Sequence, residues 1–109
     1  MPVWKKSMDL SVCIFKLTES LPKKEDYGLA SALSVPGNIA EGFGRKYTKD
    51  KLNFYYDARG SLAETKNHGI YAQRVGYIQK KDHDDLATGI EDIGKELNKL
   101  IRSLANTVG

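Results

Sequence analysis

The C-terminal third of the sequence carries an apolar repeat that fits one face of an α-helix. Leucine and isoleucine recur there at helical steps, and at 100° per residue such steps keep the side chains on one side. The repeat consists of Leu86, Ile90, Ile93, Leu97, Leu100, Ile101 and Leu104. No segment of the chain alternates apolar and polar residues as a half-buried strand does. We therefore predict an all-α chain.

Short stretches rich in proline, glycine and charge interrupt the helical pattern near positions 21–24, 42–47 and 76–81. They separate four amphipathic segments, which predicts an antiparallel up-down-up-down four-helix bundle in a single domain, residues 1–109. The expected helices run from about Val3 to Ser20, from about Asp26 to Gly42, from Thr48 to about Val75, and from near Asp82 to the C-terminal residues 105–109, which should fray.

Local signals mark where the predicted helices begin and end. Pro22 should stop the first helix, because proline cannot continue it. A left-handed glycine at Gly42 or Gly44 should stop the second, and Gly76 the third. Thr48 is a suitable N-cap for the third helix.

Pro36 lies inside the apolar pattern of the second helix. It either kinks that helix or begins its first turn, leaving residues 27–35 as a separate piece. The face expected to pack in this helix consists of Leu29, Ala32, Leu33, Ile39, Ala40 and Phe43.

The first helix has two apolar stripes, which lie about 145° apart around its axis. One stripe is formed by Trp4, Met8, Val12 and Phe15, and the other by Leu10, Ile14, Leu17 and Leu21. A helix on the surface of a monomer needs only one. We predict that one stripe faces the chain's own core and the other faces another subunit, with Trp4, Met8, Val12 and Phe15 as the oligomer interface.

The composition limits the class of protein. Of 109 residues, 40% are hydrophobic and 28% charged, as in folded domains, and the net charge is +3. No apolar run reaches 18 residues and no secretory signal is visible, so we expect a cytoplasmic protein without a membrane span. The single cysteine, Cys13, is expected to be a buried thiol.

Catalytic patterns are weak in this sequence. A metal site in the core of a bundle needs paired Glu-x-x-His motifs, and the nearest approach is Glu64 with His68, at a spacing of four and without a twin. The serines and the Gly42–Gly44 stretch match no nucleophile or phosphate-loop motif. We therefore expect no enzymatic activity, no metal and no cofactor.

A cluster of cations indicates a different function. We call residues 45–51 the basic turn, since it holds Arg45, Lys46, Lys49 and Lys51 but only one acid, Asp50. Arg59 lies two helical turns further along and extends the cluster. Such a surface binds the phosphate backbone of RNA or DNA without reading bases. The alternative is a solvated loop, and oligomerisation favours binding because it repeats the cluster in each subunit.

A protein-interaction scaffold is the competing hypothesis. The presence of two apolar stripes on the first helix supports it, and so do Tyr55 and Tyr56. These two tyrosines are adjacent in sequence and therefore lie on different faces of one helix, so one of them must be exposed or meet a partner.

The run Val35–Arg45, which contains Asn38-Ile39-Ala40-Glu41-Gly42, resembles the 23S rRNA intervening-sequence proteins, a bacterial family of four-helix bundles. Further matching pieces surround this run in the order of the family: Trp4 and 21–29 before it, and 51–52, 58–64 and 76–78 after it. The resemblance implies a homopentamer and a relation to the accessory variability proteins of diversity-generating retroelements, which bind nucleic acid and work with a reverse transcriptase.

The motif residues also have a structural interpretation. Asn38 and Glu41 are one turn apart and could anchor a polar network to the third helix through Arg59 or Ser61. In this interpretation Gly42 and Gly60 serve the fold, since a mid-helix glycine such as Gly60 usually admits a neighbouring backbone.

The sequence departs from the family after Ser31, where about five residues are missing. Five residues shorten a helix by roughly 7.5 Å and rotate its halves by about 140°. Either residues 27–31 are not continuous with the second helix, or the sequence lacks a piece of it.

Overall fold

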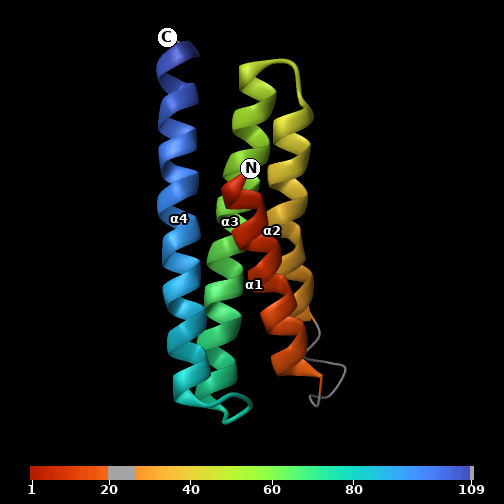
Figure 1. The fold of residues 1–109 in the computed structure, drawn as a ribbon, viewed down its shortest axis with the longest axis vertical. Coiled ribbons are helices and arrows are strands. Elements are labelled where there is room, and N and C mark those ends of the chain that lie inside the picture. The colour runs from red at the N-terminus through yellow and green to blue at the C-terminus, as the bar shows by residue number, and fades with distance from the viewer. Residues whose placement is uncertain (20–26, 109) are drawn as a thin grey trace.

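The fold is an antiparallel four-helix bundle with up-down-up-down connections (Figure 1). The computed structural model describes residues 1–19 and 27–108, and no strand occurs in them. The bundle measures 47 × 22 × 19 Å, and its helices are α1 (Pro2–Thr18), α2 (Tyr27–Gly44), α3 (Thr48–Arg74) and α4 (Lys80–Val108). The predicted fold class is confirmed, whereas the predictions for Ser20, Leu21, Pro22 and Asp26 lie outside the described residues.

Two of the predicted helix ends are wrong in detail. Thr48 is the first helical residue of α3, and Tyr47 occupies the N-cap position without a side-chain bond. Gly76, two residues after the end of α3, has a φ of +84° and follows the helix as predicted. Among the described residues it alone has a positive φ. Neither Gly42 nor Gly44 is left-handed, and α2 continues through Gly44 in ordinary helical geometry.

The apolar repeat of α4 forms one wall of the core. Its buried members are Leu86, Ile90, Ile93, Leu97 and Ile101, and Leu100 and Leu104 pack against the cluster. The opposite walls come from α2 and α3, with buried side chains at Ala32, Val35, Ile39, Leu52, Tyr55, Ala58 and Leu62. The α4 stripe read from the sequence is therefore confirmed.

The structure decides which stripe of α1 faces inward. Leu10 and Ile14 are buried and Leu17 packs beside them. On the other side Trp4, Val12 and Phe15 are 38%, 45% and 52% exposed, and Met8 is half-buried. Cys13 is exposed as well, so the expectation of a buried thiol is wrong.

Pro36 is buried inside a continuous α2, so residues 27–35 are not a separate piece. Proline has no N–H, and the carbonyl four residues earlier therefore loses its helical partner. That carbonyl belongs to Ala32, and the buried Ser11 hydroxyl of α1 lies 3.0 Å from it. A side chain of α1 thus supplies the hydrogen bond that α2 cannot make with its own backbone.

Small hydroxyl residues allow α1 to approach α2 closely. Ser7 and Ser11 are 0% and 1% exposed. Ser7 Oγ donates to the Trp4 carbonyl at 2.8 Å, and Ser11 Oγ also lies 3.1 Å from the Ser7 carbonyl. Within the described part of the chain no buried side-chain nitrogen or oxygen lacks a partner, so these buried hydroxyls carry no unpaired polar atom.

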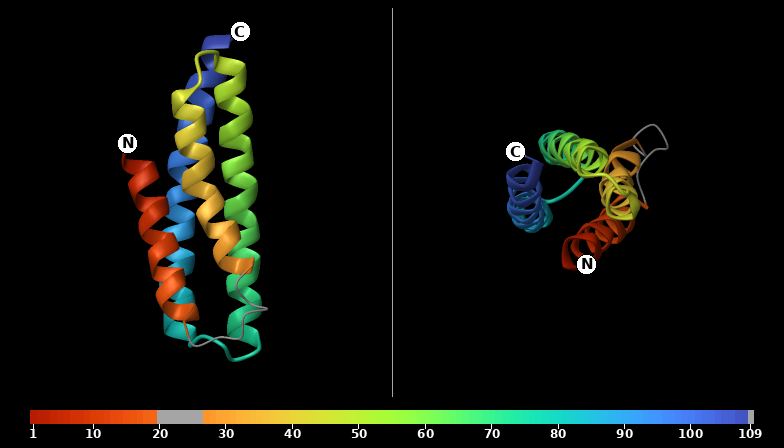
Figure 2. Two further views of the ribbon diagram at one scale, coloured as in Figure 1. Left: turned by 90° about the vertical axis from the view of Figure 1, so that its right-hand side faces the viewer. Right: turned by 90° about the horizontal axis from the view of Figure 1, so that it is seen from above.

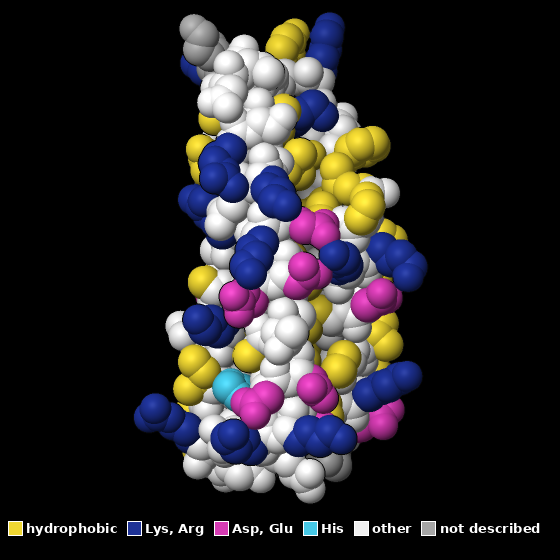
Figure 3. Space-filling model, turned by 60° about the vertical axis from the view of Figure 1, so that its left-hand side comes forward, with side chains coloured by type: hydrophobic (Ala, Val, Ile, Leu, Met, Phe, Trp, Pro, Cys, Tyr) yellow, Lys and Arg dark blue, Asp and Glu magenta, His cyan; other side chains and the backbone are white. Residues whose placement is uncertain are grey.

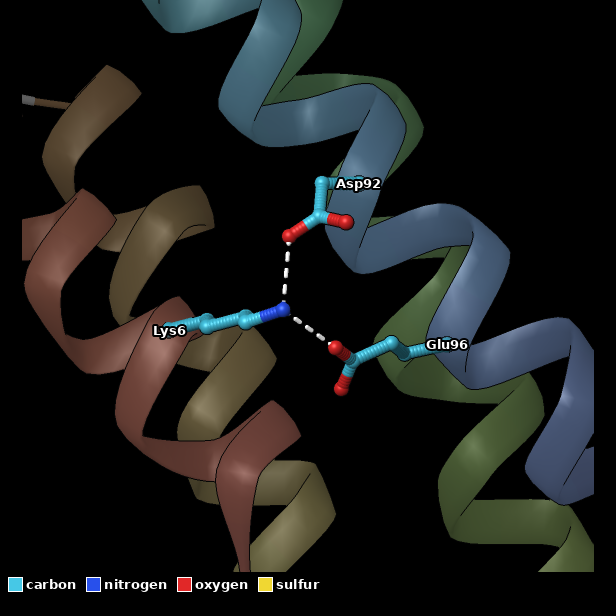
Figure 4. Close-up of polar contacts among 3 residues, drawn as sticks. All are labelled: Lys6, Asp92 and Glu96. Carbon is cyan, nitrogen blue, oxygen red and sulfur yellow. Dashed lines mark hydrogen bonds and ion pairs between the residues drawn. The ribbon is translucent and has the colours of Figure 1, made fainter.

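A lysine bridges the seam between α1 and α4. Lys6 Nζ donates to Asp92 Oδ2 at 2.8 Å and also to Glu96 Oε1 (Figure 4). The hydrogen bond to Asp92, followed by that to Glu96, raises the pKa of Lys6 above its usual value. A raised lysine pKa means that this contribution to stability is present at neutral pH and is lost only as pH rises through the alkaline range.

Helices α1 and α2 are much shorter than α3 and α4; α1 has 17 residues. Helix α2 has 18 residues, against 27 in α3 and 29 in α4, and Figure 1 shows its lower end stopping short of theirs. Residues 27–31 are continuous with the rest of α2, so the shortfall after Ser31 does not break the helix. The packed face is also narrower than predicted, since Leu33, Ala40 and Phe43 are exposed.

The link between Pro36 and Ser11 can be tested by a double-mutant cycle in urea. Ser11→Ala should destabilise the chain by about 1–3 kcal/mol, because it leaves the buried Ala32 carbonyl without a partner. In a Pro36→Ala background the backbone N–H of residue 36 can bond that carbonyl, so the same change should cost markedly less. Equal costs in both backgrounds would show that the two residues act independently.

Candidate nucleic-acid interface

The basic turn lies at the upper end of the bundle, where α2 passes into α3 (Figure 1). Residues 45–47 connect the two helices, and Lys49 and Lys51 fall in the first turn of α3. The connection from α3 to α4 lies at the opposite end. The cations of the basic turn are therefore displayed on one tip of an elongated molecule.

Lys51 has a structural contact in this turn. Its ammonium donates to the carbonyls of Gly42 and Phe43, at 3.2 and 2.8 Å. These carbonyls lie at the C-terminal end of α2, where a helix leaves acceptors unpaired and carries partial negative charge. Lys51 thus caps α2. The sequence contains a signal for this role, since a lysine soon after a helix end can fold back on it.

Arg45 is held against the bundle by two contacts. Its guanidinium lies 3.2 Å from Glu41 Oε2 and stacks over the ring of Phe54, 4.7 Å from the centroid. Because Glu41 pairs with Arg45, the residue that follows α2, it does not reach α3 as the polar-network hypothesis required. Arg45 remains exposed with part of its charge compensated.

Lys46 and Lys49 are the cations of the basic turn that form no hydrogen bond or ion pair with the described residues. Both are exposed. Lys46 Nζ lies 5.5 Å from the centre of the Tyr47 ring. Asp50 is the only acid within the turn, so a net positive charge faces solvent here.

Arg59 contacts α4 and does not join the basic turn. Its guanidinium donates to Asn98 Oδ1 at 3.1 Å and lies 5.2 Å from the centre of the Tyr56 ring. Tyr56 is 43% exposed and Tyr55 only 2%, which confirms that one of the adjacent tyrosines must face outward. Burial raises the pKa of Tyr55 above its usual value.

Asn38 joins α2 to α3 through a chain of hydroxyl groups. Its Nδ2 donates to the Ser34 carbonyl at 2.9 Å and lies 3.1 Å from Ser34 Oγ. Ser34 Oγ in turn lies 2.7 Å from Ser61 Oγ on α3. Of the two partners considered from the sequence, Asn38 is connected to Ser61, through Ser34, whereas Arg59 bonds Asn98 on α4.

The two motif glycines have opposite surroundings. A Cβ at Gly42 would lie 2.7 Å from Cε1 of the buried Tyr55 ring and 3.1 Å from Phe54 Cβ, so only glycine allows this approach of α2 to α3. At Gly60 a Cβ would meet nothing within 4 Å. The expectation that Gly60 admits a neighbouring backbone is therefore wrong within one chain, since this glycine lies exposed on α3.

No alternative site with metal-binding chemistry is formed by the described residues, which contain no group of three or more His, Cys, Asp and Glu side chains. Glu64 accepts a hydrogen bond from Ser31 at 3.2 Å. His68 and His83 are half-buried and border a cavity of about 120 Å³ at the lower end of the bundle, whose surface is mostly apolar.

The surface of α4 changes in character along its length. Asp82, Asp84 and Asp85 lie near its start, whereas no acid follows Glu96 and both Lys99 and Arg102 do. Figure 3, which looks onto the α4 and α1 side, shows acidic and basic side chains interleaved below and Lys and Arg prevailing above. The upper end of α4 therefore adds positive charge at the same end of the bundle as the basic turn.

The fold and its surface define a small antiparallel four-helix bundle with one basic end. Residues 1–99 match the family described as 23S rRNA-intervening sequence protein, and the chain belongs to that family. This confirms the resemblance seen in the sequence. Among the curated proteins, no match was found.

A solved structure shares this fold. It is the crystal structure of a protein with unknown function from the S23 ribosomal protein family of Bacteroides thetaiotaomicron VPI-5482. The two chains are 23% identical, with a TM-score of 0.83, and the similarity covers 91% of this chain and 97% of the other. In the part of the chain that the structure describes, no helix is long and apolar enough to cross a membrane.

The two glycines give a matched pair of stability measurements. Gly42→Ala should destabilise the chain by about 1–3 kcal/mol, because the new methyl group overlaps the immobile Tyr55 ring. Gly60→Ala should stabilise it by about 1 kcal/mol, since alanine favours a helix and nothing obstructs it. Urea unfolding of both variants checks the pair, and a destabilising Gly60→Ala would contradict this account of the exposed position.

Proposed function

We propose that this chain is a non-catalytic adaptor that binds the phosphate backbone of RNA or DNA through its basic turn. Lys46 and Lys49 contact phosphates, and Arg45 contributes from beside them. Lys51 holds the end of α2 in place, and Arg59 acts at a distance through the field of the basic end. One observation carries the proposal: Lys46 and Lys49 project from the tip of the bundle without a carboxylate bonded to either.

The distribution of charge supports this choice of ligand. The net charge of the chain is only +3, yet the acids of α4 lie towards the other end of the bundle. Cations that already hold carboxylates, such as Lys6 and Lys80, gain less from an added phosphate. An anionic polymer therefore meets its strongest attraction at the basic turn.

The proposal predicts salt-dependent binding that charge reversal removes. Lys46→Glu with Lys49→Glu should abolish binding of a fluorescent oligonucleotide in an anisotropy titration. For the unaltered protein, the logarithm of affinity should fall with that of salt concentration, with a slope of about −0.7 per neutralised phosphate for a single strand and about −0.9 for a duplex.

The control is the same charge change at the opposite end of the molecule. Lys80→Glu with Lys81→Glu alters the net charge equally, near the start of α4, and should leave the affinity largely intact. Equal losses in both double variants would mean that only net charge matters. Absent or salt-insensitive binding by the intact protein would refute the proposal.

The exposed stripe of α1 supports homo-oligomerisation as part of this function. Trp4, Val12 and Phe15 present apolar surface on one side of α1, and exposed apolar patches of this kind mark interaction sites. An assembly would repeat the basic turn and multiply weak phosphate contacts. The family resemblance suggests a pentamer.

Light scattering tests the interface on α1. The unaltered protein should be oligomeric at micromolar concentration, and Val12→Glu with Phe15→Glu should convert it to a folded monomer, because the charges cannot be buried between subunits. Cys13→Glu, a charge change at an exposed position about 100° or more around α1 from each stripe residue, should leave the assembly intact. A monomeric unaltered protein would contradict the interface.

A protein-interaction scaffold is the second candidate, and the same exposed stripe favours it. In this case the apolar face of α1 meets a different protein, such as a reverse transcriptase, without direct contact with nucleic acid. A protein recovered in a pull-down should then remain bound after nuclease treatment. Loss of the partner on nuclease treatment would instead favour the adaptor.

A further inference from the structure

We infer that the ligand of the basic turn is a single-stranded nucleic acid, whose unpaired bases stack on Phe43 and Tyr47 while Lys46 and Lys49 contact the neighbouring phosphates. The inference rests on the proposed function and narrows it from nucleic acid in general to one form. It also adds two aromatic side chains to a site that otherwise consists of charges.

The two rings are exposed to an extent that folding does not explain. Phe43 is 65% exposed and Tyr47 64%, the highest values among the large hydrophobic side chains that the structure describes as exposed. The nearby aromatics of α3 are more covered: Tyr55 is buried in the core, the ring of Phe54 lies under the guanidinium of Arg45, and Tyr56, at 43% exposed, has the guanidinium of Arg59 beside it. Phe43 and Tyr47 therefore contribute little to the core.

The exposed rings lie among the cations. Phe43 is in the last turn of α2 and Tyr47 directly precedes α3, so they stand on the two sides of the three-residue segment 44–46. The ammonium of Lys51 lies 5.8 Å from the centre of the Phe43 ring, and that of Lys46 lies 5.5 Å from that of Tyr47. Each aromatic surface thus has a positive charge beside it.

Rings interleaved with cations match the chemistry of an unpaired strand. In a single strand the flat faces of the bases are accessible, and aromatic side chains stack on them without regard to sequence while basic side chains follow the phosphates. In a duplex the base faces are already stacked inside the helix, so exposed rings would find only sugar and phosphate. A duplex would use the lysines and leave both rings without a function.

The surroundings favour an anionic strand over an apolar protein partner. Asp50 is the single acid within the basic turn. Glu41, which precedes the turn in the last part of α2, is already paired with Arg45. A purely apolar partner would have to cover Lys46 and Lys49 and remove their hydration without a compensating charge. An acidic peptide could satisfy the lysines, and it therefore serves as a competitor in the test.

The experiment compares matched oligonucleotides by fluorescence anisotropy with the full-length chain. The probes are a 20-nucleotide single-stranded RNA, the single-stranded DNA of the same sequence, and the corresponding duplexes. The unaltered protein should bind both single strands at least tenfold more tightly than the duplexes. Preference between RNA and DNA then identifies whether the 2′-hydroxyl also matters, and either single strand supports the inference.

Removal of the rings should affect the single strand alone. Phe43→Ala with Tyr47→Ala should lower affinity for the single strands at least tenfold, leave duplex affinity within twofold, and leave the salt slope unchanged, because the lysines remain. Tyr47→Trp should retain binding. Tyr71→Ala removes a similarly exposed aromatic outside the basic turn and should change nothing. Circular dichroism confirms that each variant folds.

The outcomes separate the inference from the proposal on which it rests. Equal affinity for single strand and duplex, or an equal loss for both on removing the rings, overturns the inference while the lysine variants can still uphold backbone binding. Failure to bind any oligonucleotide overturns both. Tighter binding of a poly-glutamate peptide than of the single strands would replace nucleic acid by an acidic protein segment as the ligand.

Discussion

The arrangement of the bundle depends on how the Ala32 carbonyl is satisfied. Pro36 deprives this carbonyl of its helical partner in the middle of a buried helix, where an unpaired acceptor is costly. The Ser11 hydroxyl meets that need from α1 and so fixes the position of α1 along and around α2. With Ser11 turned inward, Leu10 and Ile14 enter the core, and the stripe from Trp4 to Phe15 is left outside.

A second set of close contacts joins α2 to α3 and shapes the tip that carries the basic turn. The absence of a side chain at Gly42 lets the Tyr55 ring lie directly against α2, and the Ser34–Ser61 pair holds the helices together one level below. Lys51 then closes the end of α2. These contacts occupy polar groups of the Val35–Arg45 run and its surroundings in holding the fold together. The residues proposed to bind the ligand are therefore Lys46, Lys49 and their aromatic neighbours.

In the proposed adaptor, the apolar stripe of α1 and the basic turn have separate functions, association and ligand binding. The apolar stripe lies on the side of α1, and the basic turn lies at the tip formed by α2 and α3, so association through α1 need not cover the cations. The positive residues at the end of α4 lie towards the same tip. Such an arrangement would combine several weak, sequence-independent contacts into one binding surface.

The sequence by itself determined the all-α class, the four helices, the inward stripe of α4 and the outward position of one of the two central tyrosines. Helical periodicity and helix breakers are local properties, so they can be read without knowing what packs against them. The sequence also located the basic turn, but it overestimated how many of the cations are available for binding. Lys51 bonds the end of α2 and Arg59 bonds a side chain of α4, and both contacts form only when the helices pack together. The sequence wrongly predicted a buried Cys13 and a close neighbour for Gly60. In a helix with two apolar stripes, the local sequence does not determine which side chains face the core. It does not determine what packs against a glycine either. Only the tertiary structure decided which stripe of α1 is covered, that Ser11 completes the helix interrupted by Pro36, and that Phe43 and Tyr47 stand in solvent, because each of these depends on which neighbouring helix reaches the residue.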